Sequence, residues 1–170
     1  ISSAASDVYK RQAFSLLAQK DSKLYLICTG NKFSQGEEDK LSKLHIKNKT
    51  LQINASDKEL SELYTRASLF VFPSLYEGFG IPILEAYACH CPIAISNTSC
   101  FPEIAGDAAI YFDPYSVKDI ANTIEAIIYN PQKANELIQK GIKRLELYSW
   151  EKTVVETEET YKKAIQGYNF

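Results

Sequence analysis

Two carboxylates stand on either side of a glycine-containing turn at residues 77–85, which read E-G-F-G-I-P-I-L-E. The preceding apolar run, Leu69 to Phe72, is typical of a short β-strand. Pro82 suits the first turn of a helix, where its missing N–H is not needed. Ligands of parallel α/β sheets bind beyond the carboxyl ends of the strands. Glu77 and Glu85 are therefore candidate binding residues at such an edge.

The surroundings of Glu85 suggest that a ligand satisfies its charge. Glu85 is the only formally charged side chain between Gly78 and Pro102, and its neighbours in the sequence are apolar. An unpaired carboxylate in apolar surroundings is costly, so we expect a ligand to bind it. The alternatives are an exposed loop acid for Glu77 and, for Glu85, a first-turn acid favoured by the helix dipole.

The turn between the two acids is suited to an anion. Gly78 and Gly80 let the backbone turn tightly and a ligand approach it, and the N–H groups there lack intrahelical acceptors. A purely steric role of the glycines is the simpler alternative. Because a carboxylate repels an anion, we expect Glu77 and Glu85 to bind vicinal hydroxyls instead. The order hydroxyls, anion, hydroxyls fits a nucleotide sugar, in which a diphosphate joins a sugar to a ribose.

Short apolar runs alternate with helical patterns along the chain. Strands are expected at residues 23–28, 50–54, 69–72, 92–95 and 109–112. Helices are expected at 13–19, 37–45, 82–90, 102–105, 131–147 and 149–165, and after the capping residues Ser56 and Ser116. This alternation predicts an α/β fold with a doubly wound, Rossmann-like parallel sheet, because parallel neighbours need crossovers that return over a face.

The 170 residues suffice for one domain with a sizeable core. Residues 1–12 have no clear period and resemble translated sequencing-adapter tails, so we expect a non-native tail there. A Rossmann-like domain at 13–148 and a carboxyl-terminal helix at 149–170 complete the expected organisation. That helix has an apolar stripe, which is more often core than a functional surface: Trp150, Val154, Tyr161 and Ile165.

Composition argues against several classes of protein. The net charge of −2 gives no broad basic footprint, so we expect no nucleic acid partner. No apolar run reaches the roughly 18 residues of a membrane span and no signal core is apparent, which favours a cytoplasmic protein. The four cysteines are irregularly spaced and are expected to be reduced thiols. Cys89-His90-Cys91 falls short of a four-ligand site, and we expect neither a metal nor a cofactor.

The stretch from Ser56 to Pro114 resembles the carboxyl-terminal domain of retaining GT-B glycosyltransferases of the group 1 family. The most specific part is the run P-S-x-x-E-G-F-G-x-P-x-x-E-A at residues 73–86, in which Glu77 and Glu85 form the E-x7-E motif. The similarity extends from Leu24 to the last helix. It implies one half of a GT-B architecture and transfer of a sugar, with retention, from a nucleotide diphosphate sugar to an acceptor hydroxyl.

The resemblance also implies roles for single residues. Glu77 would be catalytic, contacting hydroxyls of the transferred sugar and stabilising positive charge at its anomeric carbon. Glu85 would hold the ribose diol, and Gly30 would lie near the nucleoside. Backbone amides would bind the diphosphate and the sugar at Gly78, Phe79, Gly80 and Ile81.

Some positions depart from the family pattern. His90 stands where the family usually ends a helix with glycine in a left-handed conformation. The family uses an upstream basic pair to neutralise the leaving diphosphate, and Lys10 and Arg11 lie in the suspected tail. We therefore assign them no role.

The resemblance implies an amino-terminal acceptor domain, which we expect to lie outside this chain. We therefore expect a fragment that is inactive alone, with the 149–170 helix bracing the missing domain. The acceptor would be a glycan, a lipid-linked acceptor or a small molecule, and peripheral membrane association of the longer protein stays open. The alternatives are a non-catalytic nucleotide-binding or interaction module and a GT-B nucleotide-sugar epimerase or phosphorylase.

Overall fold

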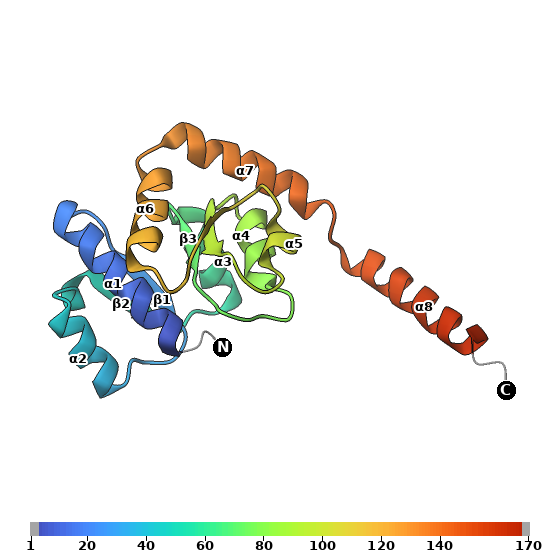
Figure 1. Ribbon diagram of the computed structural model, residues 1–170, viewed down its shortest axis with the longest axis horizontal. Coiled ribbons are helices and arrows are strands. Elements are labelled where there is room, and N and C mark those ends of the chain that lie inside the picture. Colours follow the sequence, from blue (N-terminus) through green and yellow to red (C-terminus); the bar gives the residue numbers. More distant parts are fainter. Residues whose placement is uncertain (1–3, 168–170) are drawn as a thin grey trace.

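A computed structural model describes residues 4–167, in which strands and helices alternate (Figure 1). The strands are short and all belong to parallel pairs: β1 (Leu26–Thr29), β2 (Thr50–Ile53), β3 (Phe70–Phe72), β4 (Ile93–Ser96) and β5 (Ile110–Phe112). The helices are α1 (Ala4–Lys20), α2 (Gln35–Lys43), the 3-10 helix η1 (Lys47–Lys49), α3 (Asp57–Arg66), α4 (Ile81–Ala88), α5 (Phe101–Ala105), α6 (Val117–Ile128), α7 (Pro131–Leu145) and α8 (Trp150–Gly167).

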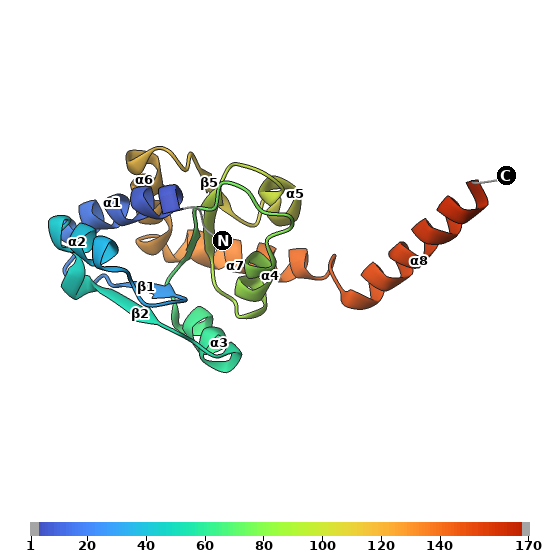
Figure 2. The same ribbon diagram turned by 90° about the horizontal axis from the view of Figure 1, so that it is seen from below.

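The parallel strands form two sheets rather than one continuous sheet. β1 pairs with β2, with Leu26 opposite Thr50, and the second sheet has the order β3-β4-β5, with Phe70 opposite Ile93. Figure 2 shows β1 and β2 together beside α2, on the side of the molecule away from α5. The expected α/β fold with parallel strands is confirmed, and the division of the sheet is a detail that the sequence did not predict.

Helices cover both faces of the larger sheet, as a doubly wound fold requires. Ile93 and Ile95 of β4 are fully buried against α4 and α5, in a cluster that includes Tyr87 and Phe101. Ala94 points to the opposite face and packs in a second cluster, which contains residues of α1, α6 and α7. This alternation along β4 places one apolar core on each side of the strand.

Two helix starts follow the capping chemistry expected from the sequence. Ser56 and Glu59 form a capping box at α3, in which the Ser56 N–H donates to Glu59 Oε2 at 2.8 Å. Ser116 Oγ accepts from the Asp119 N–H at 3.2 Å at the start of α6. These caps fix the residues at which the helices begin.

Helix α1 begins at Ala4, whereas the sequence analysis expected the first helix at residues 13–19. Arg11 is 5% exposed, because its guanidinium donates to Glu37 Oε1 at 2.8 Å and lies 5.1 Å from the centre of the Phe33 ring. An ion pair and an aromatic ring, and not an apolar side chain, fill this buried position. It therefore adds nothing to the apolar periodicity by which a helix is recognised in a sequence. The origin of residues 1–12 as a non-native tail stays a prediction, and residues 1–3 lie outside the described residues.

Helix α8 projects away from the body of the molecule (Figure 1). The four residues of its apolar stripe are between 63% and 76% exposed, so interpreting the stripe as core of this chain is wrong: Trp150, Val154, Tyr161 and Ile165. The helix itself is confirmed up to Gly167, and its role in bracing another domain stays a prediction. Over the part of the chain that the structure describes, no helix has the length and apolarity to cross a membrane.

Candidate functional site

The loop between β3 and α4 holds Glu77 in a defined position. The Oγ of Ser74, a residue 1% exposed, donates to Glu77 Oε1 at 2.8 Å. The backbone of Glu77 is held by Ser99 Oγ, which accepts from its N–H at 3.2 Å and donates to its carbonyl at 2.8 Å. Glu77 itself is partly exposed. Its carboxylate is therefore oriented by the protein while part of it remains open to a ligand.

The same loop turns its carbonyl groups toward the protein. Cys100 Sγ contacts the carbonyl oxygens of Phe79, at 3.1 Å, and Glu77, at 3.4 Å. Among residues 4–167 no protein acceptor is found for the four backbone N–H groups at positions 78–81. The first turn of α4 adds the positive end of a helix dipole. Backbone N–H groups at the start of a helix are of the kind that bind anions, and the anion site expected at this loop stays a prediction.

The two loop glycines differ in whether the fold requires glycine at their positions. Gly80 has φ 95°, and a Cβ there would lie 3.1 Å from Ile83 Cδ1 and 3.2 Å from Phe101 Cε1. Packing and backbone conformation therefore explain Gly80 without a ligand. At Gly78 a Cβ would meet no protein atom within 4 Å. The fold gives no steric reason for glycine at position 78, and the space beside it is open.

The expectation that Glu85 lies in apolar surroundings is wrong. Glu85 is exposed, and its Oε2 accepts a hydrogen bond from the Tyr64 hydroxyl at 3.3 Å. Helical periodicity explains the difference: Ile83 and Tyr87 face the core, whereas Ile81 and Glu85, one turn apart, face solvent. Neighbours in the sequence are thus not the neighbours of Glu85 in space. Its solvent-facing position makes it available to a ligand, but no desolvation penalty demands one.

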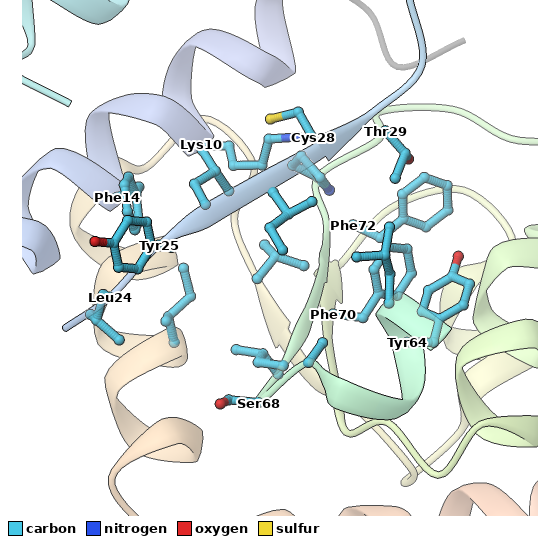
Figure 3. A pocket seen from close by; sticks show the side chains of 18 of the residues that line it. Lys10, Phe14, Leu24, Tyr25, Cys28, Thr29, Tyr64, Ser68, Phe70 and Phe72 are labelled. Atoms are coloured by element: carbon cyan, nitrogen blue, oxygen red, sulfur yellow. The ribbon is translucent and has the colours of Figure 1, made fainter. Parts of the chain in front are cut away.

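A cavity of about 730 Å³ lies between β1 and β3 and extends to the carboxyl ends of both strands (Figure 3). Thr29, Pro82 and Glu85 line its carboxyl-end side. Burial raises the pKa of Tyr64, which also lines the cavity, and the Glu85 carboxylate raises it further. The Tyr64 hydroxyl therefore stays protonated at neutral pH and donates toward Glu85.

The cavity does not bring together every residue expected at the site. Glu77 and the amides at 78–81 lie on the adjoining loop rather than in the cavity lining. Gly30 lies beside the cavity, but its N–H donates to Ile53 at 3.1 Å and its carbonyl accepts from Gln52 Nε2 at 2.7 Å. These bonds extend the pairing of β1 and β2. Contact of Gly30 with a nucleoside stays a prediction.

The ring of Phe79 packs against the protein and is not available to a ligand in the way that its backbone N–H is. The ring packs edge-on against Tyr148, with 5.6 Å between ring centroids. The side chain thus anchors the loop to the segment after α7. Any contact of Phe79 with a ligand would come from its N–H, as the resemblance implies.

Sequence reasoning missed three polar residues that support the acids. Ser74 and Ser99 orient Glu77, and Tyr64 donates to Glu85. Ser74 could have been found from its position two residues after β3. Ser99 and Tyr64 come from other parts of the chain and become neighbours only through the fold.

The structure also places the other residues singled out in the sequence. His90 has φ 56°, so this helix end does adopt the left-handed conformation that the family pattern implies. Cys91 is buried in the core. Among the described residues, no group of three or more side chains is arranged to hold a metal ion. Arg11 binds Glu37, and Lys10 lies at the cavity beside β1 (Figure 3).

Comparison with protein families matches residues 10–144 to the family described as "Glycosyl transferases group 1". The chain is 38% identical over 106 residues to O-antigen chain mannosyltransferase B of Escherichia coli, covering 62% of this chain and 28% of that protein. It is 33% identical over 114 residues to MMP alpha-(1->4)-mannosyltransferase of Mycolicibacterium hassiacum, covering 65% and 28%. The chain therefore spans about a quarter of the length of these relatives.

Solved structures show the same fold. The carboxyl-terminal domain of a glycosyl transferase group 1 family protein from Francisella tularensis superposes with a TM-score of 0.75 at 21% identity, covering 86% of this chain and 80% of that one. Sucrose-phosphate synthase from Thermosynechococcus elongatus gives a TM-score of 0.77 at 21% identity, covering 92% and 42%. This chain therefore covers less than half of the second structure.

Proposed function

The chain belongs to the glycosyl transferases group 1 family, and on that premise we propose that it is the donor-binding domain of a longer, retaining glycosyltransferase. The observation that carries the proposal is the loop at residues 77–81. It offers a fixed carboxylate and a run of N–H groups without protein acceptors at the carboxyl end of β3. An activated sugar carries hydroxyls next to a diphosphate, which is the combination that this loop can bind.

In the proposed complex the N–H groups at 78–81 bind the diphosphate and Glu77 accepts from hydroxyls of the transferred sugar. Glu85, oriented by Tyr64, binds the ribose diol at the rim of the cavity. Both acids lie next to the anion site rather than within it, which keeps their charges from opposing the phosphates directly.

The chemistry proposed for this arrangement is transfer through a positively charged, oxocarbenium-like transition state. A carboxylate fixed near the anomeric carbon stabilises that charge, and the backbone N–H groups stabilise the departing diphosphate. Alignment of the donor with an acceptor hydroxyl supplies the rest of the rate enhancement. Glu77 acts here through its charge and not as a nucleophile.

Both curated relatives named above are mannosyltransferases, so a nucleoside diphosphate mannose is the first donor to test. The chain spans about a quarter of their length, and we propose that the acceptor is bound by another domain of the longer protein. The chain alone should then bind donor but transfer nothing. The acceptor would be a glycan, a lipid-linked acceptor or a small molecule.

Calorimetry of the longer protein with GDP-mannose, UDP-glucose and the free nucleoside diphosphates tests donor binding. We expect saturable binding of one sugar donor with a Kd between about 1 µM and 1 mM. The anomeric configuration of the product, read by NMR, then tests retention. Binding of the nucleotide without any transfer to glycan acceptors would instead favour a non-catalytic nucleotide-binding module.

A further inference from the structure

The segment between β4 and α5 contacts the loop that carries Glu77. Ser99 Oγ accepts from the Glu77 N–H at 3.2 Å and donates to the Glu77 carbonyl at 2.8 Å. Cys100 Sγ donates to the Phe79 carbonyl at 3.1 Å and lies 3.4 Å from the Glu77 carbonyl, which Ser99 already holds at the shorter distance. Each of these two neighbouring side chains thus holds one carbonyl group of the loop.

A held carbonyl group also fixes the direction of the N–H group that follows it. In a trans peptide, the C=O of one residue and the N–H of the next lie in one plane and point in opposite directions. No cis peptide bond occurs among residues 4–167. Because Ser99 holds the Glu77 carbonyl, the Gly78 N–H points away from Ser99. The bond made by Cys100 directs the Gly80 N–H in the same manner.

Both of these peptide groups are followed by glycine, which makes them easy to rotate. Rotation of a peptide plane changes ψ of the residue before it and φ of the residue after it. Gly78 and Gly80 are the residues after the two planes, and glycine accepts φ of either sign. The loop sequence alone therefore leaves both orientations of each peptide group open. The hydrogen bonds from Ser99 and Cys100 select one of them.

The backbone conformation of Ser99 emphasises the part played by its hydroxyl. Ser99 has φ 55°, in the left-handed region where glycine is more stable than other residues. Glycine would suit the backbone at position 99 better, but it would lose both hydrogen bonds to Glu77. The hydroxyl is therefore the feature that distinguishes serine from the residue that this conformation favours.

We propose that Ser99 and Cys100 are positioning residues that keep the N–H groups of Gly78 and Gly80 directed toward the diphosphate of the sugar donor. The identity of the anion rests on the proposed function, whereas the orientation of the two peptide groups does not. Since Ser99 also holds the N–H of Glu77, one side chain fixes the backbone of the carboxylate and the first N–H of the anion site together.

Three variants change these hydrogen bonds with little other alteration. Ser99→Gly removes the hydroxyl and keeps the left-handed backbone, Cys100→Ala removes the thiol, and Cys100→Ser restores a donor at the same position. His45→Gly is the control for the first variant, because His45 is exposed and also left-handed, with φ 56°. Cys89→Ala is the control for the second, because the Cys89 thiol contacts Ser61 Oγ at 3.5 Å, outside the loop.

Residual dipolar couplings of the N–H groups, measured by NMR on the full chain without ligand, report the orientation directly. We expect the Gly78 coupling to change in Ser99→Gly and the Gly80 coupling to change in Cys100→Ala. Cys100→Ser and both controls should keep the wild-type couplings. A wild-type coupling at the expected glycine would overturn the role of the residue replaced. A Gly80 coupling that Cys100→Ser does not restore would assign the change to packing and overturn the role of the thiol.

Calorimetry of the same chains with GDP, UDP and ADP connects the orientation to binding. For the nucleotide that the wild type binds, we expect affinity to fall about five- to tenfold in Ser99→Gly. In Cys100→Ala it should fall about two- to fivefold, since a thiol is the weaker donor. The melting temperature of Ser99→Gly should not fall, because glycine suits the left-handed backbone.

The two measurements separate this inference from the proposed function. Changed couplings with wild-type affinity in both variants would overturn the positioning role and leave the donor site intact. If the couplings change as expected but the wild-type chain binds none of the three nucleotides, the orienting role of Ser99 and Cys100 stands and the proposed function is overturned.

Discussion

The hydroxyl of Ser74 lies 2.8 Å from Oε1 of Glu77, and the serine that supplies it is almost fully buried. The same hydroxyl also lies 3.3 Å from the Tyr76 carbonyl oxygen, so the shorter bond to Glu77 is the one that orients the carboxylate. The structure thus contains a positioning residue for the acid that the proposed chemistry needs most.

Ser74→Ala in the longer protein should lower kcat by about tenfold with little change in the donor KM. A hydrogen bond to a charged group contributes about 1.5–3 kcal/mol, and 1.4 kcal/mol corresponds to a factor of ten. Ser42→Ala is the matched control, because Ser42 Oγ also donates within the chain, to the Glu38 carbonyl at 2.9 Å, but far from the loop. Steady-state kinetics of both variants measure kcat and the donor KM. An equal loss of kcat in Ser42→Ala would contradict a positioning role for Ser74.

Tyr64→Phe should weaken donor binding about three- to tenfold, because Glu85 loses the donor that orients it. The pKa of Tyr64 is raised by burial and by the Glu85 charge, so the wild-type hydroxyl remains protonated and donor binding should not change as pH rises to 9. Tyr129→Phe is the control, since the Tyr129 hydroxyl donates to Asp21 at 2.9 Å on the surface. Calorimetric titration with donor measures both, and unchanged affinity in Tyr64→Phe would contradict the role of Glu85.

Gly78→Ala should leave folding intact while reducing donor affinity at least tenfold. No protein atom lies within 4 Å of a Cβ at this position, so a loss of affinity would report on the ligand rather than on packing. Gly36→Ala provides the comparison, because a Cβ there also meets nothing within 4 Å and the residue lies in α2. Melting temperatures check folding and calorimetry checks binding. Wild-type affinity in Gly78→Ala would place the diphosphate elsewhere.

The ion pair between Arg11 and Glu37 should make stability depend on pH in acid. Hydrogen bonding by Arg11, followed by that of Ser34, lowers the pKa of Glu37 from 4.5 to about 2. A carboxyl whose pKa is depressed in the folded state stabilises the protein above its unfolded pKa, and this contribution is lost as pH falls from about 5 to 2.

Glu37→Gln should therefore flatten the decline in the free energy of unfolding between pH 5 and pH 2. Glu38→Gln removes a carboxylate from the same helix, one that pairs with Lys47 at 3.0 Å on the surface, and serves as control. Urea unfolding at each pH gives the free energies. An unchanged slope in Glu37→Gln would show that Arg11 does not hold helix α1 through this pair.

The fold was predictable because its elements carry local signals. Ser56 and Ser116 mark helix starts through capping chemistry, and apolar runs mark the strands within a few residues. The division of the sheet carries no such signal, since a short apolar run does not indicate which other strand it pairs with. The prediction began the first helix at Ala13 because residues 1–12 lack an apolar period and were interpreted as a non-native tail. Arg11 contributes to that missing period, since its buried side chain is held by an ion pair and not by apolar packing.

The site was predictable in its residue types but not in its surroundings. The turn at Glu77 and Gly80 lies where the motif places it, at the carboxyl end of β3. The apolar environment inferred for Glu85 came from residues adjacent in sequence, whereas a helix directs every fourth residue to the same face. Tyr64 and Ser99 lie 21 and 22 residues from the acids they contact, a distance over which sequence spacing gives no information.

The central claim is that Glu77 and Glu85 bind the two hydroxyl-bearing ends of one sugar donor. Kinetics of Glu77→Gln and Glu85→Ala in the longer protein, with donor affinity measured beside them, test it most directly. We predict that Glu85→Ala weakens donor binding at least tenfold with kcat within threefold, and that Glu77→Gln lowers kcat at least a hundredfold with affinity within threefold. Equal and small effects of the two substitutions would contradict the claim.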